Sequence, residues 1–123
     1  MLKKGFKQML AEANAVIESV SVQDLTYLME NPEVKLVDVR ETVEREADGA
    51  IPGSFHVPRG LLEFKADPDS PVYEDEINPE DRLILFCGTG GRSALAAKTL
   101  FDMGYRDVSS LVGGYAAWCA AQK

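Results

Sequence analysis

Residues 83–104, LILFCGTGGRSALAAKTLFDMG, contain the pattern that decides the fold. Residues 83–86 are four large apolar residues in a row, which predicts a buried strand. Residues 88–91 contain three glycines, and the stretch that follows has helical periodicity. The apolar face of this helix is expected to be Leu95, Ala96, Leu100 and Met103, and Gly104 is placed to end it. A strand, a glycine-rich turn and a helix in this order indicate an α/β fold.

Short strands and helices alternate on both sides of this stretch. Strands are expected at 34–39, 54–57, 83–86 and 108–112, and helices after Ser21 as far as Met29, over 41–47, over 93–104 and over 115–121. Ser21 resembles a helix N-cap, and Asn31-Pro32 ends its helix because the residue before proline avoids helical geometry. The expected fold is therefore a mostly parallel sheet flanked by helices. Residues 60–81 are expected to form a surface segment with an apolar cluster of Leu61, Leu62 and Phe64.

The N-terminal segment has its own helical stripe. Apolar residues recur at steps of three and four, which predicts an amphipathic helix: Phe6, Met9, Leu10, Ala13, Val16, Ile17 and Val20. The simpler interpretation is that this helix packs on its own domain, and the alternative is a docking or dimer helix. We expect residues 1–17 to be a helical extension and residues 18–123 to be the main domain.

Composition and charge limit the function classes. A chain of 123 residues has the size of one domain, and its net charge of −7 argues against binding to nucleic acid or to anionic membranes. No apolar run is long enough to span a membrane, and polar residues interrupt any signal-like core near the N-terminus. Two cysteines are too few for a disulfide framework. These features predict a cytoplasmic protein with free thiols.

Cys87 is the candidate reactive residue. It follows the strongest predicted strand directly, at the edge of an α/β sheet where ligands bind. The glycines after it allow successive amide N–H groups to point inward as an anion nest, and the next helix adds the positive end of its dipole. This environment favours a thiolate and would hold the terminal sulfur of a Cys–S–S⁻ adduct, with Arg92 adding a permanent positive charge. The alternative is a buried structural cysteine.

The same residues carry a family resemblance. Residues 87–93, CGTGGRS, resemble the active-site loop Cys-x-x-Gly-x-Arg-Ser of rhodanese-like domains. Residues 36–41 with Glu44, residues 49–54 with Pro58, and residues 112–115 with Trp118 are similar to three further signatures of that family. The resemblance covers about residues 18–121 in the family's order and spacing.

The resemblance implies a five-stranded parallel sheet and a sulfurtransferase that uses no metal and no organic cofactor. Cys87 would take a sulfane sulfur from a donor such as thiosulfate or a persulfide, and would pass it to cyanide or a thiol. The loop residues Gly88, Thr89, Gly90, Gly91 and Arg92 would bind the persulfide. The partners implied are small sulfur donors and acceptors. A relay or sensing module that accepts persulfide from a protein partner is the alternative.

This sequence departs from the family pattern at two places. Ala50 stands where the family has histidine, at a position that is usually structural. Gly88 and Thr89 stand where members that prefer thiosulfate often carry basic residues, which argues against thiosulfate as the physiological donor. Related phosphatases have one more residue between cysteine and arginine, so phosphatase activity is not expected.

Several polar residues have expected supporting roles. Asp38 and Arg40 are expected to form an ion pair that fixes neighbouring loops, with a role beside Cys87 as the alternative. Arg59 either faces the pocket or lies on the surface. His56, the single histidine, is expected to be a hydrogen-bonded strand residue rather than a general base. Cys119 is expected to pack in the last helix, with redox pairing to Cys87 left open.

Overall fold

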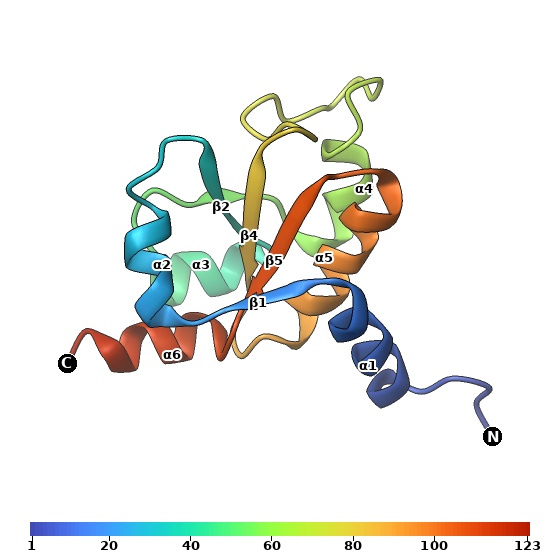
Figure 1. Cartoon of the computed structure of the whole chain (residues 1–123), viewed down its shortest axis with the longest axis horizontal. Helices are drawn as coiled ribbons and strands as arrows, with labels where there is room; N and C mark the ends of the chain where they lie inside the picture. The colour runs from blue at the N-terminus through green and yellow to red at the C-terminus, as the bar shows by residue number, and fades with distance from the viewer.

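The computed structural model describes residues 1–123 (Figure 1). Its elements follow one another as α1 (Phe6–Val16), β1 (Glu18–Val20), α2 (Val22–Leu28), β2 (Val34–Asp38), α3 (Thr42–Asp48), β3 (Phe55–His56), the 3₁₀ turn η1 (Arg59–Leu61), α4 (Leu62–Lys65), β4 (Arg82–Phe86), α5 (Gly91–Met103), β5 (Asp107–Leu111) and α6 (Gly114–Ala121). Strands and helices alternate through most of the chain, as the sequence predicts.

The five strands form one parallel sheet in the order β1-β5-β4-β2-β3. This arrangement confirms the expected five-stranded sheet. β4 is the central strand, and it pairs with β5 on one side and with β2 on the other. In the register with β2, Phe86 lies opposite Asp38. Cys87, the next residue of the chain, therefore leaves the middle of the sheet at its carboxyl edge.

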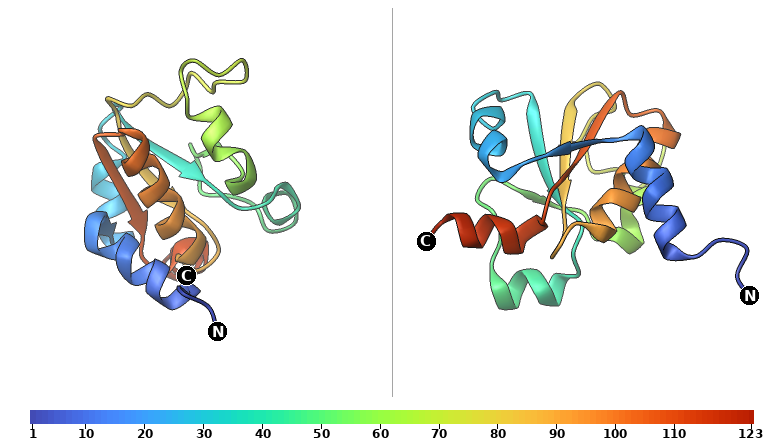
Figure 2. Two further views of the ribbon diagram at one scale, coloured as in Figure 1. Left: turned by 90° about the vertical axis from the view of Figure 1, so that its right-hand side faces the viewer. Right: turned by 60° about the horizontal axis from the view of Figure 1, so that its bottom comes forward.

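Side chains of β4 alternate between two apolar cores, one on each face of the sheet. Leu83, Leu85 and Cys87 belong to the larger core, which α1, α4 and α5 cover. Ile84 and Phe86 belong to the smaller core, against which side chains of α2 and α6 pack. Figure 2 shows the helices on both sides of the twisted sheet, with α1 beside α5. Period-two alternation thus directs the Cys87 side chain toward the start of α5.

The N-terminal helix is shorter than the apolar stripe suggests. It ends at Val16 because Ile17 has extended backbone geometry, and Glu18–Val20 forms the edge strand β1 beside β5. The prediction that Val20 continues the helix was wrong, since branched residues also favour strands. Ala13 is buried, Ile17 belongs to the larger core and Leu10 packs against it, so α1 packs on its own domain.

The segment before β4 differs from expectation in one respect. Leu62 is fully buried, but Leu61 and Phe64 are exposed, so the expected apolar cluster does not form. Ile77 inserts into the larger core instead and anchors the acidic surface loop from within. On α5, Ala96 and Leu100 are buried as expected, whereas Met103 lies on the exposed side. No helix has the length and apolar character needed to cross a membrane.

Candidate functional site

The Cys87 sulfur lies inside a cradle formed by two backbone amides and one hydroxyl group. The amide N–H groups of Gly90 and Ser93 donate to Sγ at 3.1 and 3.4 Å, and the Ser93 hydroxyl lies 3.6 Å from the same atom. Ser93 Oγ also contacts Gly90 O at 3.2 Å and Ser110 Oγ at 2.8 Å, which fixes its position. Gly90 has φ +111°, a left-handed conformation that glycine adopts readily and that turns the loop into α5.

The first turn of α6 determines how this loop is oriented. The amides of Tyr115 and Ala116 donate to the carbonyl oxygens of Cys87 and Gly88 at 2.8 and 3.1 Å. With these carbonyls bound on the outside, the loop is free to direct amides toward the sulfur. Gly114 allows α6 to approach the loop this closely, because a Cβ at residue 114 would lie only 2.5 Å from Cys87 O. The loop and the start of α6 are therefore built as one unit.

Two opposing effects act on the pKa of the Cys87 thiol. Burial raises the pKa, but the Ser93 amide and hydroxyl, followed by the Gly90 and Thr89 amides, lower it by a larger amount in sum. The net result is a pKa below the ordinary thiol value, because hydrogen bonds to the charged form favour ionisation. A thiolate is both the better nucleophile and the form that this cradle stabilises.

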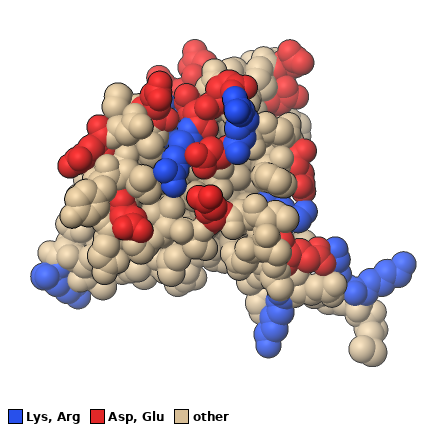
Figure 3. All heavy atoms as spheres, viewed as in Figure 1, with Lys and Arg blue, Asp and Glu red and all other residues tan.

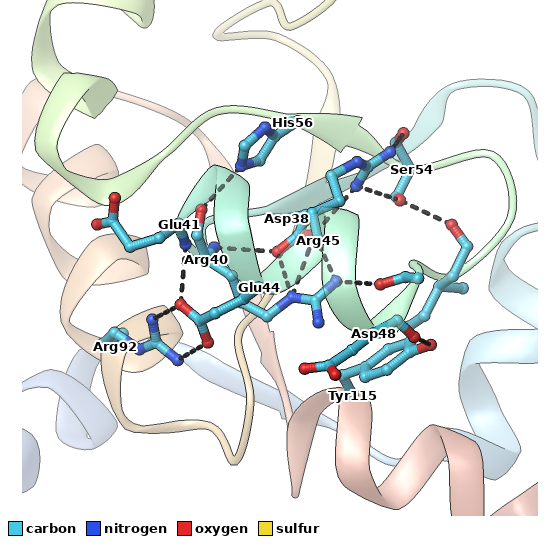
Figure 4. Close-up of polar contacts among 12 residues, drawn as sticks. Asp38, Arg40, Glu41, Glu44, Arg45, Asp48, Ser54, His56, Arg92 and Tyr115 are labelled. Atoms are coloured by element: carbon cyan, nitrogen blue, oxygen red, sulfur yellow. Dashed lines mark hydrogen bonds and ion pairs between the residues drawn. The ribbon is translucent and has the colours of Figure 1, made fainter.

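Cys87 itself is only 1% exposed. The partly exposed side chain of Arg92 lies where the loop meets solvent, which we call the mouth of the cradle. A methyl group on Gly88 would come within 3.3 Å of Arg92 Nη2, so the guanidinium lies against the loop. Glu44 of α3 holds this guanidinium with two parallel bonds, Nη1–Oε1 at 2.6 Å and Nη2–Oε2 at 2.9 Å (Figure 4). The expected positive charge is therefore present, but a carboxylate compensates it.

Asp38 and Arg40 form the expected ion pair, and both are buried. Arg40 Nε and Nη2 reach the two Asp38 oxygens at 3.0 and 2.9 Å, and Arg45 Nη1 donates to the same carboxylate at 3.0 Å. The Arg40 guanidinium also lies 4.4 Å from the centre of the Tyr115 ring and donates to Gly49 O at 2.7 Å (Figure 4). This pair thus connects β2 with α3 and α6, and it does not contact the sulfur.

The remaining candidate residues lie apart from the thiol. Arg59 donates to Thr99 Oγ1 at 3.2 Å and, with Arg92, lines a surface cleft beside the cradle. His56 Nε2 lies 2.8 Å from the carbonyl oxygen of Arg40, which confirms a hydrogen-bonded strand histidine. Cys87 and Cys119 are both free thiols. No cluster of histidine, cysteine and carboxylate side chains has the geometry of a metal site.

Three contributors to this arrangement lie within the family signatures, but the sequence predicts no individual role for them: Ser93, Glu44 and Gly114. Ser93 follows Arg92 in the motif, and a hydroxyl in the first turn of a helix after a glycine loop is a signal that could have identified it. Glu44 is distant in sequence, and no local pattern reveals its pairing with Arg92. Gly114 lies in the signature of residues 112–115, but its contact with Cys87 O depends on tertiary structure, so no local pattern reveals it.

Comparisons with known proteins agree with this geometry. Across residues 21–121 the chain matches the family described as the rhodanese-like domain. Human thiosulfate:glutathione sulfurtransferase is 31% identical over 111 residues, which cover 81% of this chain and 91% of the relative. A protein of Bacillus subtilis named as a candidate sulfur carrier is 30% identical over 118 residues, covering 95% of this chain. The chain spans only 58% of that relative's length.

A solved structure resembles the whole chain, including α1. It is a protein of unknown function from Rhodopseudomonas palustris, described as a possible tyrosine phosphatase, with 42% identity and a TM-score of 0.93. The alignment covers 99% of this chain and 94% of that one. The match over residues 21–121, the parallel sheet and the cysteine loop at its centre lead to one conclusion: the chain belongs to the rhodanese-like domain family.

Proposed function

We propose that this protein is a sulfurtransferase in which Cys87 carries the transferred sulfur as a persulfide. One observation supports this most directly: two amides and one hydroxyl surround Sγ and lower the thiol pKa in spite of burial. Such donors stabilise a sulfur anion in the same way that an oxyanion hole stabilises oxygen. Relatives named as sulfurtransferases are consistent with the proposal.

The reaction would have two steps. When thiosulfate is the donor, the Cys87 thiolate attacks its outer sulfur, the S–S bond of the donor breaks, and sulfite leaves with the bonding electron pair. An acceptor thiolate then attacks the outer sulfur of Cys87–S–S⁻, and the electron pair returns to Sγ. The first amides of α5, at Gly91 and Arg92, have no helical acceptor and would bind the terminal sulfur. Neither step needs a metal or a redox cofactor.

Access to the thiol requires a movement at the mouth of the cradle. Because Cys87 is nearly sealed, the Arg92–Glu44 pair would have to part before a donor reaches Sγ. Both side chains are partly exposed, at 43% and 31%, so water can replace their mutual contacts at small cost. Once released, Arg92 would attract the anionic donor. Asp38 and Arg40 would support the reaction only by holding α3 and α6 in place.

Phosphate chemistry fits the cradle less well. Four residues, 88–91, separate Cys87 from Arg92, and Arg92 is already engaged by a carboxylate. Hydrolysis of p-nitrophenyl phosphate is therefore expected to be undetectable. A relay role, in which a protein partner supplies the persulfide, uses the same cradle, and the name of the Bacillus subtilis relative favours it as the second candidate. The two sulfur roles differ only in the donor that loads Cys87.

Intact-mass spectrometry tests the proposal. After exposure to thiosulfate or polysulfide, the protein should gain about 32 Da on Cys87, and cyanide or a thiol should remove it. Cys87→Ser should gain nothing, and Cys119→Ser should behave like the wild type. Loading by a persulfidated protein alone would favour the relay role. Failure of all three donors to load the wild type would refute the proposal.

A further inference from the structure

A cleft between α1 and α5 adjoins the cradle, and half of the residues that line it are cations. Its volume is about 250 Å³, and its lining comprises Lys4, Met9, Glu12, Arg59, Arg92, Leu95, Lys98 and Thr99. Four of the 13 basic residues of the chain border this one cleft, against a single acid. This local excess of basic residues contrasts with the net charge of −7 of the whole chain. On the face drawn in Figure 3, acidic side chains dominate the upper part, and basic side chains lie around α1.

Partner carboxylates hold three of these cations from outside the cleft. Glu44, Glu63 and Asp102 pair with Arg92, Arg59 and Lys98 at 2.6, 3.1 and 2.8 Å, and none of the three acids lines the cleft. These pairs are partly exposed, and such pairs typically contribute little to stability. The cations can therefore turn toward a ligand at small cost.

Glu12 shows which ligand chemistry the cleft accepts. Its carboxylate accepts a bond from Lys4 Nζ at 2.8 Å, and the charge of Lys98 acts on it as well. A carboxylate of the protein is thus already bound by one cation of the cleft and attracted by a second, and Arg92 connects this cleft to the cradle. A small molecule with carboxylates would meet the same ammonium groups and, in addition, the planar fork of Arg59.

We propose that this cleft binds the carboxylates of a small anionic thiol, whose sulfur is directed toward Cys87 past Arg92. The proposal rests on the proposed sulfur transfer and names its acceptor class: a thiol bearing two or more carboxylates. The volume suits a small molecule rather than a protein segment. One wall is α1, which lies outside the residues that match the family, so the selectivity would belong to this chain and to relatives that share α1.

Kinetics with two acceptors test the proposal. Mercaptosuccinate carries two carboxylates, and 2-mercaptoethanol carries none. Lys98→Gln should raise the KM for mercaptosuccinate about fivefold and leave both kcat and the KM for 2-mercaptoethanol unchanged. Glu12→Gln should lower the KM for mercaptosuccinate by a similar factor, because it frees Lys4. Both effects should fade in 0.5 M salt, since exposed charges are screened.

Arg106→Gln is the matched control. It removes one positive charge from an exposed pair with Glu80, next to the first residue of β5 and hence at the sheet edge opposite the cradle. It should alter neither KM. If it raises the KM for mercaptosuccinate as much as Lys98→Gln does, a general electrostatic effect explains the data and the cleft proposal is wrong. Equal shifts for the two acceptors would also refute it.

A binding measurement separates this proposal from the proposed reaction. Tricarballylate, a tricarboxylate without sulfur, should perturb the NMR amide signals of α1 and of residues 95–99 in the Cys87→Ser protein, and less so when Lys98→Gln is added. Binding without any thiol turnover would leave the cleft proposal standing and refute sulfur transfer. Turnover of mercaptosuccinate with no tricarballylate binding at the cleft would refute the cleft proposal alone.

Discussion

Glu44 and Arg92, which are 48 residues apart in the chain, meet in a two-point ion pair over the mouth of the Cys87 cradle. Glu44 accepts from the Glu41 amide as well, so the N-terminal capping box of α3 holds the carboxylate in place. The bond to Arg92, followed by the bond from Glu41, lowers the pKa of Glu44 to about 2. The pair therefore remains ionised throughout the physiological pH range.

Release of this pair should speed the loading of the cradle. Glu44→Gln removes the charge that compensates Arg92, so we expect persulfide formation from thiosulfate to accelerate severalfold in stopped-flow assays. The cost in stability should stay below about 1 kcal/mol, because both side chains are partly exposed. Glu63→Gln, which releases Arg59 instead, is the control and should leave the loading rate nearly unchanged. Slower loading in Glu44→Gln would contradict a gating role.

The same pair predicts a pH dependence of stability. The folded-state pKa of Glu44, about 2, lies below its ordinary value near 4.5. The stabilisation is therefore complete above about pH 4.5 and is lost as the pH falls through 2. Urea unfolding between pH 2 and 6 should show the wild type losing more stability than Glu44→Gln. Parallel profiles for the two proteins would show that the pair contributes nothing.

Ser93 should control ionisation of the thiol. Ser93→Ala removes a hydroxyl that lowers the pKa of Cys87, so the pKa should rise and alkylation by iodoacetamide at pH 7 should slow about tenfold. The rate-against-pH curve, which should have its midpoint below the ordinary thiol value of about 8.5, measures the change. Ser109→Ala is the matched control, because this serine is also buried and its hydroxyl has no partner. If Ser93→Ala leaves the midpoint of the curve unchanged, the amides alone are enough to lower the pKa of Cys87.

Gly114 should be indispensable for the shape of the loop. A Cβ at this position would lie 2.5 Å from Cys87 O and 2.9 Å from the Gly88 carbonyl carbon, and φ is +59°. Gly114→Ala should therefore lower the free energy of unfolding by about 1–3 kcal/mol and reduce persulfide loading more than tenfold. Gly53→Ala shares the positive φ, +82°, but meets no neighbour within 4 Å. It should cost stability through its backbone alone and preserve loading.

The buried ion pair should be a major contributor to stability. Asp38→Asn leaves the Arg40 guanidinium buried without its counter-ion, which typically costs about 3–5 kcal/mol. Burial raises the pKa of Asp38, but the hydrogen bonds from Arg40 and Arg45 together lower it by a larger amount. The pKa of Asp38 is therefore below its ordinary value of 3.8. The stabilisation is present above that value and is lost as the pH falls. Glu80→Gln, which breaks an exposed pair, should change the unfolding midpoint very little.

The sequence by itself determined the features that depend on neighbours along the chain. The apolar run before Cys87 predicts β4, the glycines predict the turn, and Ser21 caps α2 with a bond to Asp24 N at 3.1 Å, as expected. These outcomes follow from backbone sterics and periodicity, which operate over a few residues. The prediction for the end of α1 was wrong because it used local helical preference alone. Glu18 pairs with Ser109, 91 residues away in the chain, and this strand pairing competes with the helix.

Only the tertiary structure decided what surrounds the thiol. The carbonyl partners on α6, the Glu44 carboxylate over Arg92 and the cationic cleft beside α1 all join segments that are far apart in sequence. Hydrogen bonds and ion pairs act over a few ångströms in space, whatever the separation along the chain. Residues 87–93 therefore identify where the chemistry would occur, and the packing of three helices around them decides whether the sulfur is ionised, reachable and selective.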